Sequence, residues 1–183
     1  MTERLLITVF GPAGSGKGAV GKLLAKHLQC EHIDMGDLRR EMARSYGVSL
    51  EELHQLGLRD RKYDDIQDER VRKLPEEHDR LLIVSRTAWF LLPQSIKVLL
   101  TCRPKVGAER VAQRQKISIE EALQRNSERD QVDGERYKRY VGIPEYPPKQ
   151  DVFDVVVDSS DMPPEDVLRE LIEKTQKVTE NRR

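Results

Sequence analysis

The feature that most constrains this chain is an apolar segment followed by a glycine-rich loop near its start. Residues 5–10, LLITVF, are apolar or β-branched and predict a buried strand. Residues 11–18, GPAGSGKG, then match the pattern G-x-x-x-x-G-K, and apolar residues at helical spacing follow up to residue 28. A strand, this loop and a helix, in this order, indicate a phosphate-binding loop.

The glycine spacing in this loop has a physical reason. Glycines let the backbone turn through conformations that are closed to other residues, so that successive amide N–H groups point at a phosphate. The following helix adds its positive end, and Lys17 reaches the β- and γ-phosphates. We therefore expect ATP to be bound by Gly11, Pro12, Ala13, Gly14, Ser15, Gly16, Lys17, Gly18 and Ala19.

The loop departs from the general motif at its end. A Ser or Thr normally follows the lysine and helps to hold Mg²⁺, whereas this chain has Gly18 and Ala19. Neither residue has a side-chain oxygen. We therefore assign no metal-ligating residue, and we expect Mg²⁺ to be held largely through water and nucleotide oxygens.

The composition points to small-molecule partners. The 183 residues predict one domain, and 32 basic residues balance 32 acidic ones, so nothing favours binding to nucleic acid or to an anionic membrane. No apolar segment approaches the ~20 residues of a membrane span, and the first residues lead into a strand instead of resembling a signal peptide. Cys30 and Cys102 are far apart in the sequence, so we expect reduced thiols in a cytoplasmic protein. We also expect a monomer whose partners are small-molecule nucleotides.

Strands and helices alternate along the rest of the chain. Further short apolar segments at 31–33, 81–85, 96–102 and 153–158 predict strands, and amphipathic segments separate them. Ser49-x-x-Glu52 and Ser118-x-x-Glu121 have the capping-box spacing that begins a helix. The pattern predicts an α/β fold with a parallel sheet between helices, a three-layer P-loop NTPase fold.

Several segments outside the loop also follow a known order. They are HIDMGDLRREMA at 32–43, GVSLEEL at 47–53, Asp64-x-x-x-Asp68, SRTAW at 85–89, Arg125-x-x-x-Arg129 and FDVVVD at 153–158. With the loop, they closely resemble the nucleoside monophosphate kinases of the archaeal-type cytidylate kinase family. The resemblance covers nearly the whole chain, and the motifs between residues 11 and 53 are the most specific.

The resemblance implies an enzyme that phosphorylates CMP or dCMP with ATP and Mg²⁺. It also implies a single kinase domain of the nucleoside monophosphate kinase type over residues 1–183, with an acceptor-binding segment at about 34–75 and a lid at about 110–140. Carried over to this chain, the catalytic residues are Lys17, Arg110, Arg114, Arg125 and Arg129, and the acceptor-binding residues are Asp37, Arg40, Asp64, Asp68 and Arg86.

The residues alone leave other interpretations open for this set. Arginines four apart, such as Arg125 and Arg129, share a helix face, and such faces usually form surface ion pairs. The carboxylates of the set are equally typical of helix ends and surfaces. Arg86 is the stronger candidate because it follows an apolar strand, at the edge where ligands bind in open α/β sheets.

A second function remains open because the chain departs from the family pattern. Val84-Ser85-Arg86 stands where the family usually has Glu-Gly-Arg, and Asp34 stands where it usually has Ser. Together with the missing hydroxyl after Lys17, these departures are compatible with a kinase-fold protein that binds nucleotide but transfers phosphate poorly, acting as a sensor or interaction module. The six arginines named above favour the active enzyme.

Overall fold

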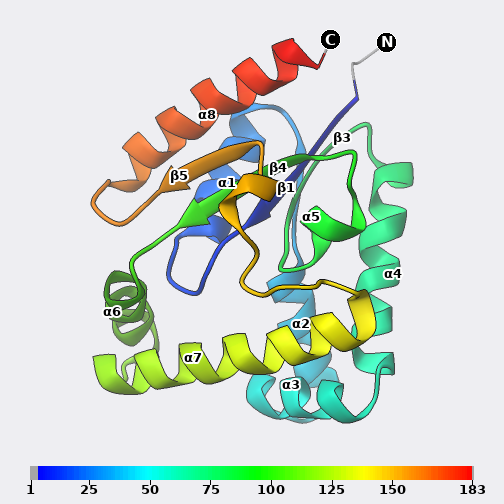
Figure 1. Cartoon of the computed structure of the whole chain (residues 1–183), viewed down its shortest axis with the longest axis vertical. Coiled ribbons are helices and arrows are strands. Elements are labelled where there is room, and N and C mark those ends of the chain that lie inside the picture. Colours follow the sequence, from blue (N-terminus) through cyan, green and yellow to red (C-terminus); the bar gives the residue numbers. More distant parts are fainter. Residues whose placement is uncertain (1–3, 183) are drawn as a thin grey trace.

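The computed structural model describes residues 4–182 and contains a five-stranded parallel sheet in the order β2-β3-β1-β4-β5 (Figure 1). The strands are β1 (Leu5–Phe10), β2 (Glu31–Asp34), β3 (Arg80–Val84), β4 (Ile96–Thr101) and β5 (Val155–Asp158). In the register of the central strand, Ile7 lies opposite Leu82 on one side and Ile96 on the other. The predicted parallel α/β fold is confirmed.

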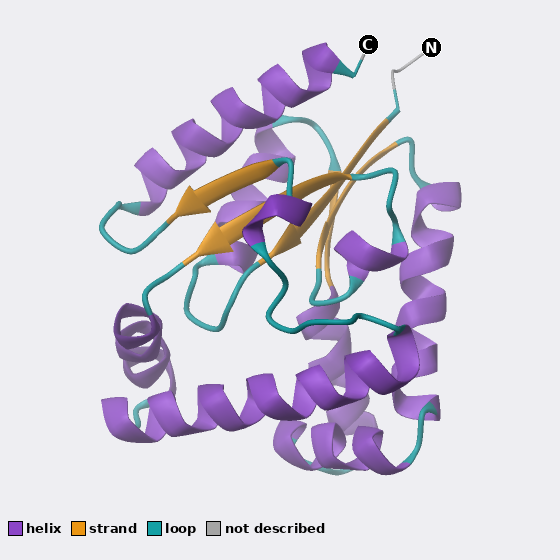
Figure 2. Ribbon diagram, in the orientation of Figure 1, coloured by secondary structure: helices purple, strands orange, loops and turns teal. Residues whose placement is uncertain are grey.

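Helices fill the connections between the strands (Figure 2). They are α1 (Lys17–His27), α2 (Met35–Ser45), α3 (Leu50–Arg59), α4 (Lys62–Glu77), α5 (Ala88–Leu91), α6 (Pro104–Gln115), α7 (Ile119–Arg136) and α8 (Pro164–Asn181), with a π-helical turn η1 (Tyr137–Val141) and a 3₁₀ turn η2 (Gln150–Val152). Ser49 and Glu52 form both bonds of the predicted capping box at α3. At α7, the Ser118 hydroxyl accepts a hydrogen bond from the Glu121 amide at 3.0 Å.

The sheet is buried on both faces, as a parallel sheet requires. Ile7 and Val9 point to one face, where they pack against Leu24 of α1 and Leu171 of α8. On the other face, α4 and α5 pack against the sheet through a second apolar cluster. Alternate side chains of β1 therefore enter different cores, which explains why this central strand is apolar or β-branched along its whole length.

Helices α6 and α7 extend beyond the carboxyl ends of the strands, and α7 runs from α6 to α3 (Figure 1). Where α7 passes into η1, Tyr137 joins a buried cluster that also contains Phe10, Trp89 and Phe153. Trp89 and Tyr137 are packing residues in this arrangement. Within residues 4–182, no helix is both long and apolar enough to cross a bilayer.

Candidate functional site

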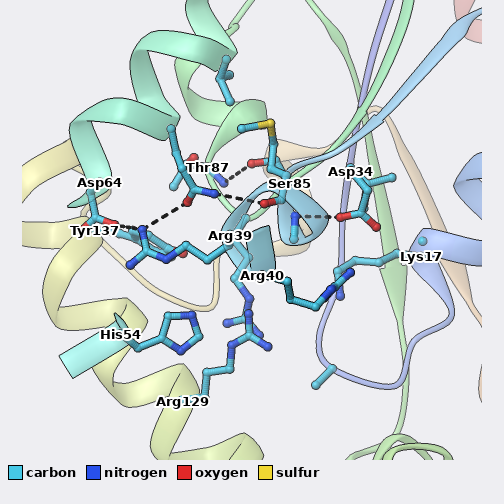
Figure 3. Close-up of a pocket in the computed structure, with 18 of the residues that line it drawn as sticks. Lys17, Asp34, Arg39, Arg40, His54, Asp64, Ser85, Thr87, Arg129 and Tyr137 are labelled. Atoms are coloured by element: carbon cyan, nitrogen blue, oxygen red, sulfur yellow. Dashed lines mark hydrogen bonds and ion pairs between the residues drawn. The ribbon is translucent and has the colours of Figure 1, made fainter. Parts of the chain in front are cut away.

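A cavity of about 250 Å³ opens at the carboxyl ends of the strands, between the glycine-rich loop and α7 (Figure 3). Its lining comes from the loop, from the segments that follow β2 and β3, and from α4, α6 and α7. Open α/β sheets bind their ligands at this edge. The fold therefore gathers residues from distant parts of the chain around one space, for example Lys17 and Tyr137.

The loop has the backbone geometry of a phosphate cradle. Gly14 and Gly16 have φ values of +78° and +81°, in the left-handed region that favours glycine. A Cβ atom at Gly14 would lie 2.1 Å from the carbonyl oxygen of Gly107, so the loop also touches the first turn of α6. Lys17 begins α1, and its Nζ atom donates a hydrogen bond to the Pro12 carbonyl at 3.1 Å. These residues fit the phosphates of a nucleotide.

The cavity also carries an excess of positive charge, which favours binding of an anion. Burial, together with the positive charges of Arg86 and Arg129, lowers the pKa of Lys17 to about 7, while Asp34 and Asp130 oppose the shift. The Nε atom of Arg129 is buried without a hydrogen-bond partner among the described residues. Positive charge in the cavity thus exceeds its compensation, and a bound phosphate would supply the missing negative charge.

Arg86 is fixed at the entrance to α5 by its own segment and by α7. The Ser85 hydroxyl accepts hydrogen bonds from the amides of Thr87 and Ala88, which shapes the turn after β3. The Nη1 atom of Arg86 then lies 2.8 Å from Asp130 Oδ1 and 2.6 Å from Asp133 Oδ2. Burial opposes the charge on Arg86, but these carboxylates and the Tyr146 hydroxyl keep its pKa well above the usual value.

A buried ion network joins α2, α4 and α7 below the cavity. Asp64 of α4 accepts hydrogen bonds from Arg39 of α2 at 3.1 Å and from Nε of Arg136 at 2.9 Å. Arg136 in turn donates to Asp133 Oδ1 at 2.9 Å. Both oxygens of Asp64 are therefore occupied by arginines, which gives this predicted acceptor-binding residue a supporting position in the cavity wall.

Asp68, one turn further along α4, is in a different environment. Its Oδ1 atom accepts a hydrogen bond from the Thr87 hydroxyl at 3.3 Å, and burial raises its pKa to about 6, with Asp64 adding to the shift. Arg40 on α2 reaches the cavity and pairs with Asp37, which is exposed and outside the cavity lining. Asp68 and Thr87 thus leave polar groups available in the cavity wall, and the Arg40 guanidinium reaches the cavity beside Gly36.

The cavity brings together most of the predicted site residues, though not all of them. Those that line it are Ala13, Gly14, Gly16, Lys17, Gly18, Ala19, Arg40, Asp64, Asp68, Arg86, Arg114 and Arg129. Gly11, Pro12, Ser15, Asp37, Arg110 and Arg125 lie outside the lining. The first three still belong to the loop and shape its backbone.

Arg110 and Arg125, both expected to be catalytic, lie outside the cavity lining because each has partners elsewhere. Arg110 donates to the carbonyl oxygens of Gly14 at 3.2 Å and Ser159 at 2.7 Å, and so supports the loop from behind. Arg125 pairs with Glu121 one turn earlier on α7, at 2.6 Å, and is about half exposed. Each arginine therefore has its own partner away from the cavity, whereas Arg114 and Arg129 line it.

Sequence reasoning missed several lining residues, namely Asp34, Arg39, His54, Gln67, Thr87, Arg136 and Tyr137 in the roles described here. His54 is buried, and burial lowers its pKa to about 3. Asp34 carries a usable signal, because Asp-x-Gly after a strand is typical of a side chain that caps the next helix. The others are charged or polar residues on helices, where the sequence gives no sign that tertiary packing will bury them.

A model of the cytidylate kinase-like family matches residues 6–161 of the chain. The chain belongs to this family. A cytidylate kinase of Haloarcula marismortui is 36% identical over 141 residues, which cover 76% of this chain and 73% of that protein. A cytidylate kinase of Pyrococcus horikoshii is 32% identical over 166 residues, covering 91% of this chain and 85% of the relative.

Solved structures agree with the fold of this family member. An uncharacterised protein from Eubacterium ventriosum superposes with a TM-score of 0.71 at 18% identity, covering 96% of this chain and 99% of that one. A gluconokinase from Sinorhizobium meliloti gives 0.63 at 18% identity, with coverage of 97% and 95%. A shikimate kinase from Aquifex aeolicus gives 0.58 at 22% identity, with coverage of 94% and 97%. These similarities establish the three-layer fold of the P-loop kinases.

Proposed function

We propose that this chain transfers the γ-phosphoryl group of ATP to CMP or dCMP, producing CDP or dCDP. Membership of the cytidylate kinase-like family, together with the loop, supports phosphorylation of a nucleoside monophosphate. The observation that carries the proposal is the convergence of Lys17, Arg86 and Arg129 on one cavity, where burial and the charges of the two arginines lower the pKa of Lys17. Phosphoryl transfer needs such a cationic site because negative charge is spread over the moving group.

The two ends of the cavity suggest where each nucleotide binds. The loop and Lys17 provide the donor end, since their amides and charge suit the β- and γ-phosphates of ATP. Asp68 and Thr87 provide the acceptor end, and Figure 3 shows Thr87 across the cavity from Lys17 with Arg40 between them. Arg86 precedes Thr87 in the chain and lies close enough to Lys17 to lower its pKa, so it can bind the acceptor phosphate and hold it in line with the donor.

Arg129 and Arg114 complete the cation set from α7 and α6. Arg129 lines the cavity with only a long ion pair, 3.6 Å from its Nε atom to Asp133 Oδ2, so its positive charge is available to an incoming phosphate. When Mg²⁺ is bound it would neutralise charge on the β- and γ-phosphates. Among residues 4–182, no group of three or more His, Cys, Asp or Glu side chains is placed to hold a metal ion.

Asp68 is our candidate for reading the acceptor base. A carboxylate oxygen accepts hydrogen bonds from an amino group but repels a carbonyl oxygen. Cytosine carries an amino group where uracil carries a carbonyl group, so an ionised Asp68 would favour CMP over UMP. The Thr87 hydroxyl fixes the orientation of the carboxylate through its hydrogen bond to Oδ1.

A coupled assay of ATP consumption with CMP, dCMP, UMP, AMP and GMP tests the proposal. We expect turnover with CMP and dCMP and much less with the other acceptors. Turnover with none of the five would contradict the enzyme and favour a nucleotide-binding sensor, an alternative that the cytidylate kinase relatives do not support. Size-exclusion chromatography with light scattering, at the assay concentration, tests the expected monomer.

A further inference from the structure

The space beside the end of the glycine-rich loop is occupied by another side chain. Position 18 holds glycine where the general motif places the hydroxyl-bearing Ser or Thr. A Cβ atom built on Gly18 would lie 2.9 Å from Oδ2 of Asp34, closer than real Cβ contacts come. The carboxylate of Asp34 therefore occupies the direction in which a Ser or Thr side chain would leave the backbone.

Asp34 is held in this place by its own position in the chain. It is the last residue of β2, and its Oδ1 atom accepts a hydrogen bond from the Gly36 amide at 2.8 Å, which caps α2. A Cβ atom at Gly36 would lie 2.9 Å from the same oxygen, so glycine there permits the close approach. Within residues 4–182, Oδ2 accepts no hydrogen bond. One carboxylate oxygen is thus used for the cap, and the other faces Gly18.

Asp34 also lies at the end of the cavity where ATP phosphates are expected to bind. It lines the cavity together with Lys17 and Gly18, and in Figure 3 its carboxylate lies at the same end as Lys17, away from Asp64 and Tyr137. This end belongs to the donor loop. Any group bound by Oδ2 therefore lies next to the phosphates that the loop is shaped to hold.

We propose that Asp34 Oδ2 is a protein ligand of the Mg²⁺ that accompanies ATP, in place of the hydroxyl absent from Gly18. Mg²⁺ in phosphoryl-transfer enzymes is held by one or two carboxylates together with substrate phosphates and water, and a single free carboxylate oxygen beside the loop meets this requirement. The inference rests on the proposed function, because it needs ATP in the loop. It replaces the sequence expectation that no side chain of this chain binds the metal.

A side chain at position 18 and the Asp34 carboxylate cannot occupy the same space, which gives the proposal a second test. Either a side chain extends from position 18 or the Asp34 carboxylate lies there, since the two would overlap. Glycine at 18 is therefore required by the carboxylate, and the carboxylate takes the role that glycine cannot perform. In the general motif a hydroxyl at the start of the helix binds the metal, whereas here a carboxylate at the end of β2 would bind it at the same place.

Binding of Mn²⁺, followed by electron paramagnetic resonance in the presence of the non-hydrolysable analogue AMP-PNP, tests this directly. We expect Asp34→Asn to weaken Mn²⁺ binding by about tenfold or more. The Asn side chain keeps an oxygen for the Gly36 amide, so the cap is preserved. AMP-PNP binding in EDTA should be unchanged, because the loop itself is intact.

Asp158→Asn is the matched control. Asp158 ends β5 and accepts a hydrogen bond from the Ser160 amide at 2.9 Å, as Asp34 does from Gly36. The Asp158→Asn substitution removes the same charge from the same edge of the sheet, but at a residue outside the cavity lining. We expect its Mn²⁺ affinity to equal that of the wild type.

A paired exchange gives a second, independent test. Asp34→Ser alone should lose Mn²⁺ affinity, and Gly18→Thr added to it should restore most of the loss, because a hydroxyl returns to the vacated space. Wild-type Mn²⁺ affinity in Asp34→Asn with AMP-PNP bound, or no recovery in the folded double variant, would overturn the assignment of Asp34 alone. Failure of the wild type to bind AMP-PNP would instead overturn the proposed function and this inference together.

Discussion

Arg86 Nη1 and Asp133 Oδ2 lie 2.6 Å apart, and this ion pair joins the end of β3 to the buried face of α7. Asp133 also pairs with Arg136 at 2.9 Å and with Arg129 at 3.6 Å. Burial alone would raise the pKa of Asp133, but the three arginines lower it. One carboxylate thus fixes the positions of two cavity arginines and of a third that supports the wall.

Replacing Asp133 should destabilise the fold. Asp133→Asn leaves three buried guanidinium groups with less negative charge, and breaking a buried pair in this way costs about 3–5 kcal/mol. Urea unfolding gives the change in free energy. Asp130→Asn is the control, because Asp130 pairs with the same Arg86 but is one third exposed, so its loss should be much smaller. Equal losses in the two variants would contradict the central position of Asp133.

Lys17→Met should abolish phosphoryl transfer while the protein stays folded. The lysine charge is directed at phosphates that become more negative in the transition state, so we expect kcat to fall by about 10²–10³ or more. In the absence of nucleotide the variant should melt at a higher temperature, because it no longer buries an uncompensated cation. Lys22→Met, on the exposed face of α1, is the control. Equal turnover in wild type and Lys17→Met would remove Lys17 from the mechanism.

Arg129 and Arg125 lie one turn apart on α7 and should differ in effect. Arg129→Ala removes a cation that lines the cavity, so it should lower kcat more than it raises KM for either nucleotide. Arg125→Ala breaks only an exposed pair with Glu121, and we expect a much smaller loss. Steady-state kinetics with CMP and ATP distinguish the two. A change confined to KM in Arg129→Ala would make Arg129 a binding residue without a special role in the transition state.

Asp68→Asn should weaken the discrimination between CMP and UMP. An amide can both donate and accept hydrogen bonds, so the variant loses the repulsion that the carboxylate exerts on a carbonyl group. The ratio of kcat/KM for CMP and UMP should fall by about tenfold, which is worth about 1.4 kcal/mol. Asp65→Asn, on the same helix but paired with Arg61, serves as the control. An unchanged ratio in the folded Asp68 variant would place base recognition elsewhere.

His54 should make the protein less stable in acid. Its pKa is about 3 in the folded state, lowered by burial, against about 6.5 when unfolded. The unfolded state therefore binds the proton first, so stability is complete above pH 6.5 and falls as the pH drops towards 3. At pH 5 this loss amounts to about 2 kcal/mol. His54→Gln should lessen the difference in urea midpoint between pH 7.5 and pH 5, whereas His27→Gln at an exposed site should not.

The elements near the sheet were predictable because their signals are local. The segment 5–10 is apolar throughout and forms β1, and Ser49 and Glu52 form the cap that their spacing predicts. The same holds for the loop, whose function depends on a continuous stretch of backbone. A buried parallel strand and a glycine-rich loop need no distant partner to be recognised in a sequence.

The ion network was not predictable because it depends on residues far apart in the chain. Asp64 and Arg136 are separated by 72 positions, and each is typical of a solvated helix face until α4 and α7 pack together. Arg110 shows the opposite case: its spacing to Arg114 suggested a shared face, but the carbonyl groups of Gly14 and Ser159 bind it instead. Helical periodicity gives the face of a residue and does not give the partner that the fold brings to it.

The contact between Gly14 and Gly107 has a mechanical consequence. A Cβ atom on either residue would overlap the backbone around the other, so the first turn of α6 is fastened to the donor loop. A side chain at either position would therefore push the first turn of α6 away from the loop, and with it Arg114, which lines the cavity two turns later on the same helix. The two glycines thus set the distance between the loop that fits the donor phosphates and a cation of α6.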